Sequence, residues 1–407
     1  MPADFKKLIT ARFLFSFAVQ MQAVVLGWRI YELLKDPLYL GFIGLAEAVP
    51  AIGLALFAGY IVDRSRPLVV YRRVIYVSFV SGLVVLVEHL LADTISLGMQ
   101  VGMLYSASFL TGLARSFAQP SIFATVPRIV ERSKLMQATA MSSSALQVAR
   151  IAGPAFGGLV FGFYGAVVSS SIVCALLLIG VFVMFSIRRE IPRPDFRNKH
   201  ASISEELLSG AKFVYKHPIL FPALSLDMIS VLFGGVTALL PIFASEILMV
   251  GPKGLGALRA APAIGATFMG LFLSRTSGMR TGRWLLSSIT GFGVCILLFG
   301  LSRDFYLSMI ALIFSGAFDS ISMVIRSAAV QLSSPDHMRG KISAVNSIFI
   351  GSSNELGEVE SGIAAKLLGT IPAVYLGGVV CLLTVGLVSY FSPVLRRMDL
   401  KQLAPPS

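Results

Sequence analysis

The sequence predicts an all-α membrane protein with twelve transmembrane helices. Of its 407 residues, 56% are hydrophobic and only 14% are charged. Apolar runs of about 20 residues, the length that crosses a bilayer as a helix, recur along nearly the whole chain. A spanning segment must satisfy its own backbone hydrogen bonds, so only helix bundles and closed barrels qualify. The runs are longer and more uniformly apolar than barrel strands, which alternate over about 10 residues, and this favours the helix bundle.

The apolar runs define about twelve predicted spans, separated by short polar loops and one long hydrophilic segment in the middle. The spans cover residues 8–34, 38–63, 72–92, 96–122, 134–162, 166–187, 218–246, 254–275, 283–302, 305–330, 341–367 and 372–395. We therefore divide the chain into an N-terminal six-helix bundle, a cytoplasmic linker, a C-terminal six-helix bundle and a cytoplasmic tail, at residues 1–187, 188–217, 218–395 and 396–407.

The linker contains one predicted short amphipathic helix on the cytoplasmic face. Ser202 and Glu205 stand at the spacing of a capping box, ahead of Leu207 and Leu208. We interpret this helix as a plain connection rather than a regulatory element.

Positive charge is distributed unevenly between the loops. The net charge is +13, and Lys and Arg crowd every second loop. The intervening loops hold little more than Lys35, Lys253 and Arg303. Positive residues favour the cytoplasmic side, so both termini are predicted to be cytoplasmic. The basic balance is explained in this way without a nucleic-acid partner.

The two halves of the chain repeat one another. Residues 44–53 match residues 256–265 at a constant offset of 212, with prolines and glycines aligned. Further on the offset becomes 204, and it pairs Gly112 with Gly316, Gly153 with Gly357, and Gly165 with Gly369. The constant offsets indicate two six-span halves in parallel orientation.

The end of the second span and the loop that follows it contain Gly59, Asp63, Arg64 and Arg66. This pattern resembles the loop between helices two and three of the major facilitator superfamily, roughly G-x-x-x-D-R-x-x-R. The resemblance implies that Asp63 docks near a helix start of the other half, where the helix dipole favours an anion. It also implies that Arg64 and Arg66 complete a cytoplasmic latch.

The fifth span contains Gly153, Pro154, Gly157 and Gly158, and it resembles the G-P-x-x-G-G antiporter motif of export branches. Within the superfamily the chain is similar to the branch with bacterial macrolide-efflux and siderophore-export proteins. The resemblance implies a secondary transporter that exports a small amphiphilic molecule in exchange for protons. It also implies a multi-pass monomer in the lipid bilayer of the bacterial cytoplasmic (inner) membrane.

Charged residues inside the spans are costly, so each is a functional candidate. In the resembled fold, spans one, four, seven and ten line the cavity, and spans two, five, eight and eleven form the seam between halves. Cavity or substrate candidates are Gln20, Gln22, Arg115, Gln119, Asp227 and Arg326. Seam ion-pair candidates are Arg150, Arg259 and Asn354.

We suggest that ion pairs inside the spans break and re-form as the cavity switches sides, because an acid is easier to protonate once its arginine partner leaves. The candidates for proton coupling, in order, are Asp319, Glu355, Glu358 and Glu47. Drug exporters of the superfamily often carry an acid in span one, whereas this chain has Gln20 and Gln22 there.

Two other functions remain open on the sequence. The chain could import a metabolite or lysolipid without proton coupling, or it could be a membrane-embedded receptor or enzyme. No Walker loop, nucleophile elbow or redox pair appears, and the three cysteines lack metal-binding spacing. We therefore predict no enzyme activity, no metal and no cofactor.

Overall fold

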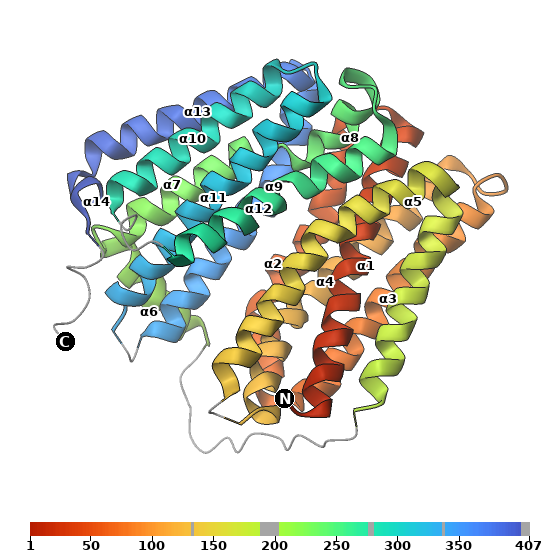
Figure 1. Cartoon of the computed structure of the whole chain (residues 1–407), viewed down its shortest axis with the longest axis horizontal. Coiled ribbons are helices and arrows are strands. Elements are labelled where there is room, and N and C mark those ends of the chain that lie inside the picture. The colour runs from red at the N-terminus through yellow and green to blue at the C-terminus, as the bar shows by residue number, and fades with distance from the viewer. Residues whose placement is uncertain (132–133, 188–202, 276–280, 336–337, 400–407) are drawn as a thin grey trace. The chain divides into compact units, whose positions relative to one another are not determined.

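The computed structural model describes residues 1–131, 134–187, 203–275, 281–335 and 338–399. Apart from an isolated bridge between Thr281 and Asp399, the regular structure in these ranges is helical (Figure 1). The chain forms two compact units. Unit 1 comprises residues 1–199 and 240–260, and unit 2 comprises residues 200–239 and 261–407.

Unit 1 is built mainly from the first five long helices. They are α1 (Ala3–Leu34), α2 (Pro37–Arg64), α3 (Pro67–Leu91), α4 (Leu97–Ile129) and α5 (Leu135–Phe185). Each of the starts of α2 and α4 has a polar cap: Asp36 accepts from Leu38 N at 3.0 Å, and Ser96 accepts from Met99 N at 3.4 Å. Such caps satisfy amide groups that the first helical turn leaves without partners.

Unit 2 holds most of the later helices. They are α6 (Ile203–Lys216), α7 (Leu220–Gly234), α10 (Gly282–Leu301), α11 (Phe305–Ser333), α12 (Arg339–Leu368), α13 (Thr370–Phe391) and α14 (Pro393–Arg397). Helix α9 (Gly251–Arg275) contributes its first part to unit 1 and its remainder to unit 2. Helix α6 lies where the sequence predicts the amphipathic linker helix, while residues 188–202 lie outside the described residues.

Nine helices in the described part of the chain are long and apolar enough to cross a membrane. Most predicted spans coincide with one helix to within a few residues, and two of them, 134–162 and 166–187, share α5. Gly165 divides α5, because its φ of 80° breaks the helix without any intervening loop. Glycine adopts positive φ at little steric cost, so this single residue makes the turn.

The seventh predicted span is not one continuous helix. Helix α7 ends at Gly234, and a 3₁₀ turn (Thr237–Leu239), a short α8 (Leu240–Ile242) and a π-helix (Phe243–Ile247) follow. The extended Gly235 breaks the helix, and its freed carbonyl accepts a hydrogen bond from Ser361 Oγ at 2.9 Å. A broken helix is tolerated at membrane depth when a neighbour satisfies the backbone in this way.

Repeat-matched glycines allow close helix packing in each unit. A Cβ on Gly153 would lie 2.9 Å from Phe17 O of α1, and one on Gly357 would lie 2.9 Å from Leu232 O of α7. Small residues are what let membrane helices approach at their backbones. Each unit also has its own apolar core, with Phe5, Tyr71 and Leu177 in unit 1 and Leu220, Leu285 and Ile325 in unit 2.

Candidate functional site

The glycine-proline motif of α5 is a packing surface in unit 1. Gly153, Pro154, Gly157 and Gly158 are all buried. A Cβ on Gly157 would lie 2.9 Å from Met21 Cγ, and one on Gly158 would lie 2.6 Å from Gly256 Cα. The motif therefore fixes how closely α5 crosses α1 and the start of α9.

An ion pair joins α2 to α4 in unit 1. The Arg115 guanidinium contacts the Glu47 carboxylate, and the two side chains are 47% and 21% exposed. The helices meet closely here, because a Cβ on Gly112 would lie 2.8 Å from the Glu47 carbonyl carbon. The structure thus brings together a cavity candidate and a proton-coupling candidate.

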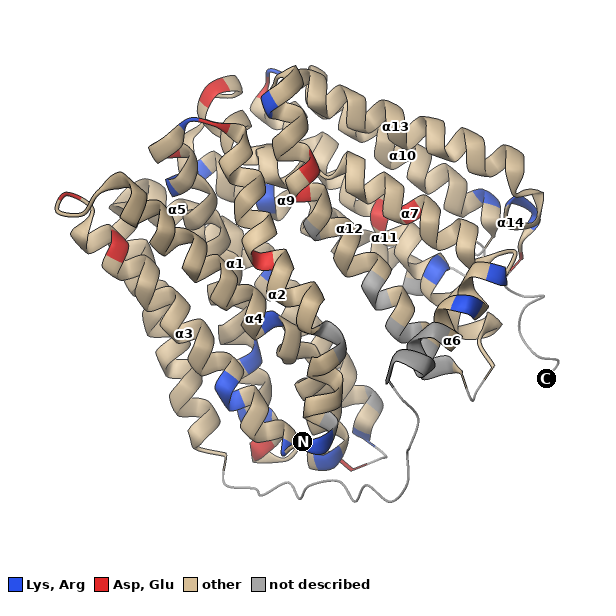
Figure 2. Ribbon diagram, turned by 180° about the vertical axis from the view of Figure 1, so that it is seen from behind, with Lys and Arg blue, Asp and Glu red and all other residues tan. Residues whose placement is uncertain are grey.

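Further polar groups lie around this pair. Arg12 Nη2 donates to Gln119 Oε1 at 2.8 Å, and its Nη1 contacts Ser142 Oγ. Arg150 is exposed and lies within electrostatic range of Arg12 and Arg115. The sequence reasoning missed Arg12, although a cation ten residues into an apolar helix is itself a signal. Lys and Arg gather mainly at the end of unit 1 that holds the N-terminus (Figure 2).

The two glutamines of α1 have different positions. Gln20 is partly buried beside Gly153 of α5. Gln22 is only 2% exposed, and its Nε2 donates to Ser81 Oγ at 2.9 Å and Thr111 Oγ1 at 3.4 Å. Gln22 therefore ties α1 to α3 and α4 inside unit 1, and this contact differs from the cavity position that its spacing in the sequence predicts. Helical spacing alone did not distinguish these two faces of α1.

A second ion pair joins α7 to α11 in unit 2. Arg326 Nη1 lies 2.5 Å from Asp227 Oδ2, and each side chain is only 6% exposed. Arg326 Nε also donates to Ser322 Oγ at 3.2 Å. Asp319 lies within electrostatic range of both members of the pair. Figure 2 shows the acidic segments of α7 and α11 in an otherwise mostly uncharged part of unit 2.

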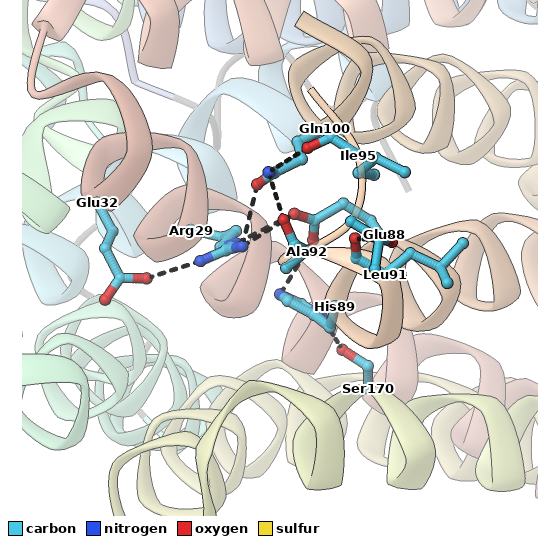
Figure 3. Close-up of polar contacts among 10 residues, drawn as sticks. Arg29, Glu32, Glu88, His89, Leu91, Ala92, Ile95, Gln100 and Ser170 are labelled. Atoms are coloured by element: carbon cyan, nitrogen blue, oxygen red, sulfur yellow. Dashed lines mark hydrogen bonds and ion pairs between the residues drawn. The ribbon is translucent and has the colours of Figure 1, made fainter. Parts of the chain in front are cut away.

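A third polar cluster, at one end of α3 in unit 1, was not predicted (Figure 3). Arg29 of α1 lies 3.1 Å from Glu88 Oε1 and 3.3 Å from Glu32 Oε2. Glu88 is fully buried, and His89 beside it contacts Ser170 Oγ at 2.8 Å through Nδ1. Pairing Arg29 in the first predicted span with Glu88 in the third could have indicated this cluster.

The remaining candidates are less fully defined. Gly59 has open space around it, and Arg64 lies over the Tyr60 ring at 3.9 Å. Arg66 is exposed. Arg259 lies beside Gly27 of α1. Glu358 is partly buried, and Asn354 is exposed with its Nδ2 donating to Ile350 O at 2.7 Å. The side chains of Asp63 and Glu355 lie outside the described residues.

Within the described ranges, no group of three or more His, Cys, Asp or Glu side chains could hold a metal ion.

Comparison with known proteins places this geometry in context. A family profile described as "Transmembrane secretion effector" matches residues 3–406. The Enterobactin exporter EntS of Escherichia coli O1:K1 / APEC is 26% identical over 271 residues, which cover 66% of this chain and 62% of that protein. The protein of the same name from Shigella boydii serotype 18 gives the same figures. The match thus spans about three fifths of the length of these relatives.

Solved structures share the fold. A transporter of the POT family in complex with 5-aminolevulinic acid has a TM-score of 0.74 at 12% identity, covering 98% of this chain and 97% of its own. The nucleoside transporter NupG has a TM-score of 0.69 at 14% identity, covering 96% and 98% respectively. At these identities the likeness concerns the fold alone.

Proposed function

Because the chain belongs to the transmembrane secretion effector family of the major facilitator superfamily, whose members are transporters and not enzymes, we propose that it exports a small amphiphilic molecule in exchange for protons. The distant likeness to enterobactin exporters supports the direction of transport and makes a siderophore the first substrate to test.

The observation that carries proton exchange is the buried charge cluster of unit 2. Asp227 and Asp319 lie near Arg326, whose single positive charge neutralises only one carboxylate. A second carboxylate in a segment of low dielectric is stabilised by binding a proton. We assign the binding and release of that proton to Asp319. In this step Arg326 exchanges its ion-pair partner between Asp227 and Asp319. Glu47, Glu355 and Glu358 remain the alternative acids.

The proposed architecture follows the sequence. It has twelve membrane helices in two six-helix bundles related by a pseudo-two-fold axis, with both termini in the cytoplasm of a bacterium. The transporter acts as a monomer in the inner membrane. Substrate binding involves Gln20, Arg115 and Gln119, while Arg150, Arg259 and Asn354 act at the seam between the bundles. The Asp63 loop acts as the cytoplasmic latch.

The test is efflux from proteoliposomes that contain the purified chain. The vesicles are loaded with enterobactin and a pH-sensitive dye, and the outside is then acidified. Export with matched acidification of the lumen is the expected result. In Asp319→Asn, acidification is lost, whereas Asp93→Asn, which changes an exposed loop acid, serves as the matched control. Efflux that moves no protons would instead identify a facilitator.

A further inference from the structure

The cluster around Glu88 draws side chains from four helices of unit 1 (Figure 3). Helix α1 contributes Arg29 and Glu32, and α3 contributes Glu88 and His89. Helices α4 and α5 contribute Gln100 and Ser170, neither of which titrates. The Glu88 and His89 side chains are 0% and 2% exposed, whereas Glu32 is 50% exposed. The charge pattern of the loops predicts that this end of α3 faces the outside of the cell.

Hydrogen bonds satisfy only one side of the Glu88 carboxylate. Its Oε1 accepts from Arg29 Nε at 3.2 Å and from Arg29 Nη2 at 3.1 Å. Its Oε2 lies 3.4 Å from His89 Nε2. Among the described residues, both of these atoms are buried and lack a hydrogen-bond partner. Two buried polar atoms that face each other in this way are costly unless a proton lies between them.

The other side of His89 suits either protonation state. Its Nδ1 lies 2.8 Å from Ser170 Oγ, and a serine hydroxyl can donate or accept. When His89 is neutral with its proton on Nε2, Ser170 donates to Nδ1. When His89 is charged, both ring nitrogens donate, one to Ser170 and one to Glu88. Gain of a proton therefore requires only that the Ser170 hydroxyl rotate.

The formal charges of the cluster sum to zero once His89 is protonated. Arg29 contributes one positive charge, while Glu32 and Glu88 contribute two negative charges. The buried Glu88 is the acid in contact with His89, 3.4 Å from its Nε2, whereas water screens the half-exposed Glu32. Gln100 connects this site to the turn after α3: its Oε1 accepts from Arg29 Nη2 at 3.2 Å, and its Nε2 donates to Ala92 O at 2.8 Å.

We propose that Glu88 and His89 form a proton-binding site at the outer end of unit 1, in which the protonated His89 ring donates through Nε2 to Glu88 Oε2 and through Nδ1 to Ser170 Oγ. The site is separate from the acids of unit 2 and takes protons from the outer side, past the exposed Glu32. Its role in transport rests on the proposed proton exchange, whereas proton binding itself does not.

The chain offers a direct test without any substrate. It has four histidines, so H200Q, H217N and H337Q together leave His89 as the single histidine. The full chain is purified with labelled imidazole carbons, and their NMR signals are followed against pH. We expect one titration step, and in Glu88→Gln proton binding at His89 weakens at least about tenfold, because an opposite charge within hydrogen-bonding distance is lost.

Two further variants make the test specific. Glu32→Gln removes an exposed acid of the same cluster and should change proton binding by less than about threefold, because water screens it. Ser170→Ala keeps every charge, and it provides the second readout if Glu88→Gln does not fold: it should weaken binding about threefold, because a hydrogen bond to a charged partner is lost. The proposal would be overturned if the His89 signal does not titrate. It would also be overturned if Glu88→Gln and Ser170→Ala both leave the His89 titration the same as in the single-histidine chain.

Flux measurements then separate the two proposals. In proteoliposomes that export enterobactin, His89→Gln should shift the outer pH at which export is half-maximal, while the proton exchange assigned to Asp319 continues. An unshifted pH dependence of export in His89→Gln contradicts a role of the site in transport. Absence of any export together with an intact His89 titration instead contradicts the proposed function and leaves the proton-binding site standing.

Discussion

The ion pair that joins α2 to α4 in unit 1 and the one that joins α7 to α11 in unit 2 differ in their access to solvent. In unit 1, Glu47 and Arg115 are 21% and 47% exposed. In unit 2, Asp227 and Arg326 are each 6% exposed. Water or substrate can replace either partner of the first pair, whereas the second pair is shielded from solvent and has Asp319 as a neighbouring charge. The exposed pair is therefore suited to binding a substrate, and the buried pair is suited to holding charged groups, or a proton, away from solvent.

The largest effect is expected when the buried pair is broken. Arg326→Leu leaves Asp227 without its partner, so we expect it to lower the free energy of unfolding by about 3–5 kcal/mol. Denaturant unfolding of the purified chain measures this. The double change Asp227→Leu with Arg326→Leu should recover most of the loss, because it removes both charges. A single variant as stable as wild type would show that the pair is not buried in the membrane.

The comparison can be sharpened with the matched glycines. Gly153→Ala and Gly357→Ala each place a Cβ within 3 Å of a backbone oxygen of the neighbouring helix. We expect a similar loss of about 1–3 kcal/mol in both, because each overpacks a close helix crossing. Gly102→Ala, whose Cβ would have nothing within 4 Å, is the control in thermal unfolding. Clearly unequal losses would show that the two units do not share this packing.

The exposed pair should contribute little to stability. Arg115→Gln is expected to change the free energy of unfolding by no more than about 1 kcal/mol, because solvent screens exposed ion pairs. The same variant should reduce enterobactin export from proteoliposomes at least about tenfold, since it removes a charge from the proposed binding surface. Arg303→Gln, in a predicted outer loop, is the matched control. Export at the wild-type rate by Arg115→Gln would show that the surface around Arg115 does not bind the substrate.

The smallest effect is expected at His217, which contributes to the pH dependence of stability separately from the buried acids of unit 2. His217 Nδ1 accepts from the Ile219 and Leu220 amides at 3.2 Å where α7 begins, and burial lowers the pKa of His217. A lowered pKa in the folded state means that stability is complete above the unfolded pKa of about 6.5 and declines as pH falls below it. We expect His217→Asn, which keeps an acceptor, to remove this decline in pH-dependent melting curves. If stability still declines to the same extent as pH falls in His217→Asn, other titratable groups cause the decline.

The sequence was sufficient to locate nearly every helix, because apolar runs of membrane length are a strong signal. It could not show that the seventh predicted span breaks at Gly235, since Ser361, which satisfies the broken backbone, lies far away in the chain. Many charges within the spans were found from the sequence, although Arg12 and Arg29 were missed, and the partners of the charges were not found. Glu47 meets Arg115 and Asp227 meets Arg326 across distances of 68 and about 100 residues, and only packing decides such pairs.

The glycine that divides α5 has a repeat-matched counterpart in unit 2, where Gly369, with a φ of 94°, directly joins α12 to α13. In both places two long helices meet at a single residue. The angle between the helices can change there, but the distance between their adjoining ends cannot. Neither helix can advance along its own axis without drawing the other with it. We therefore expect the two helices of each hairpin to move by changing the angle between them. Axial sliding of one helix along the other is not expected in either hairpin.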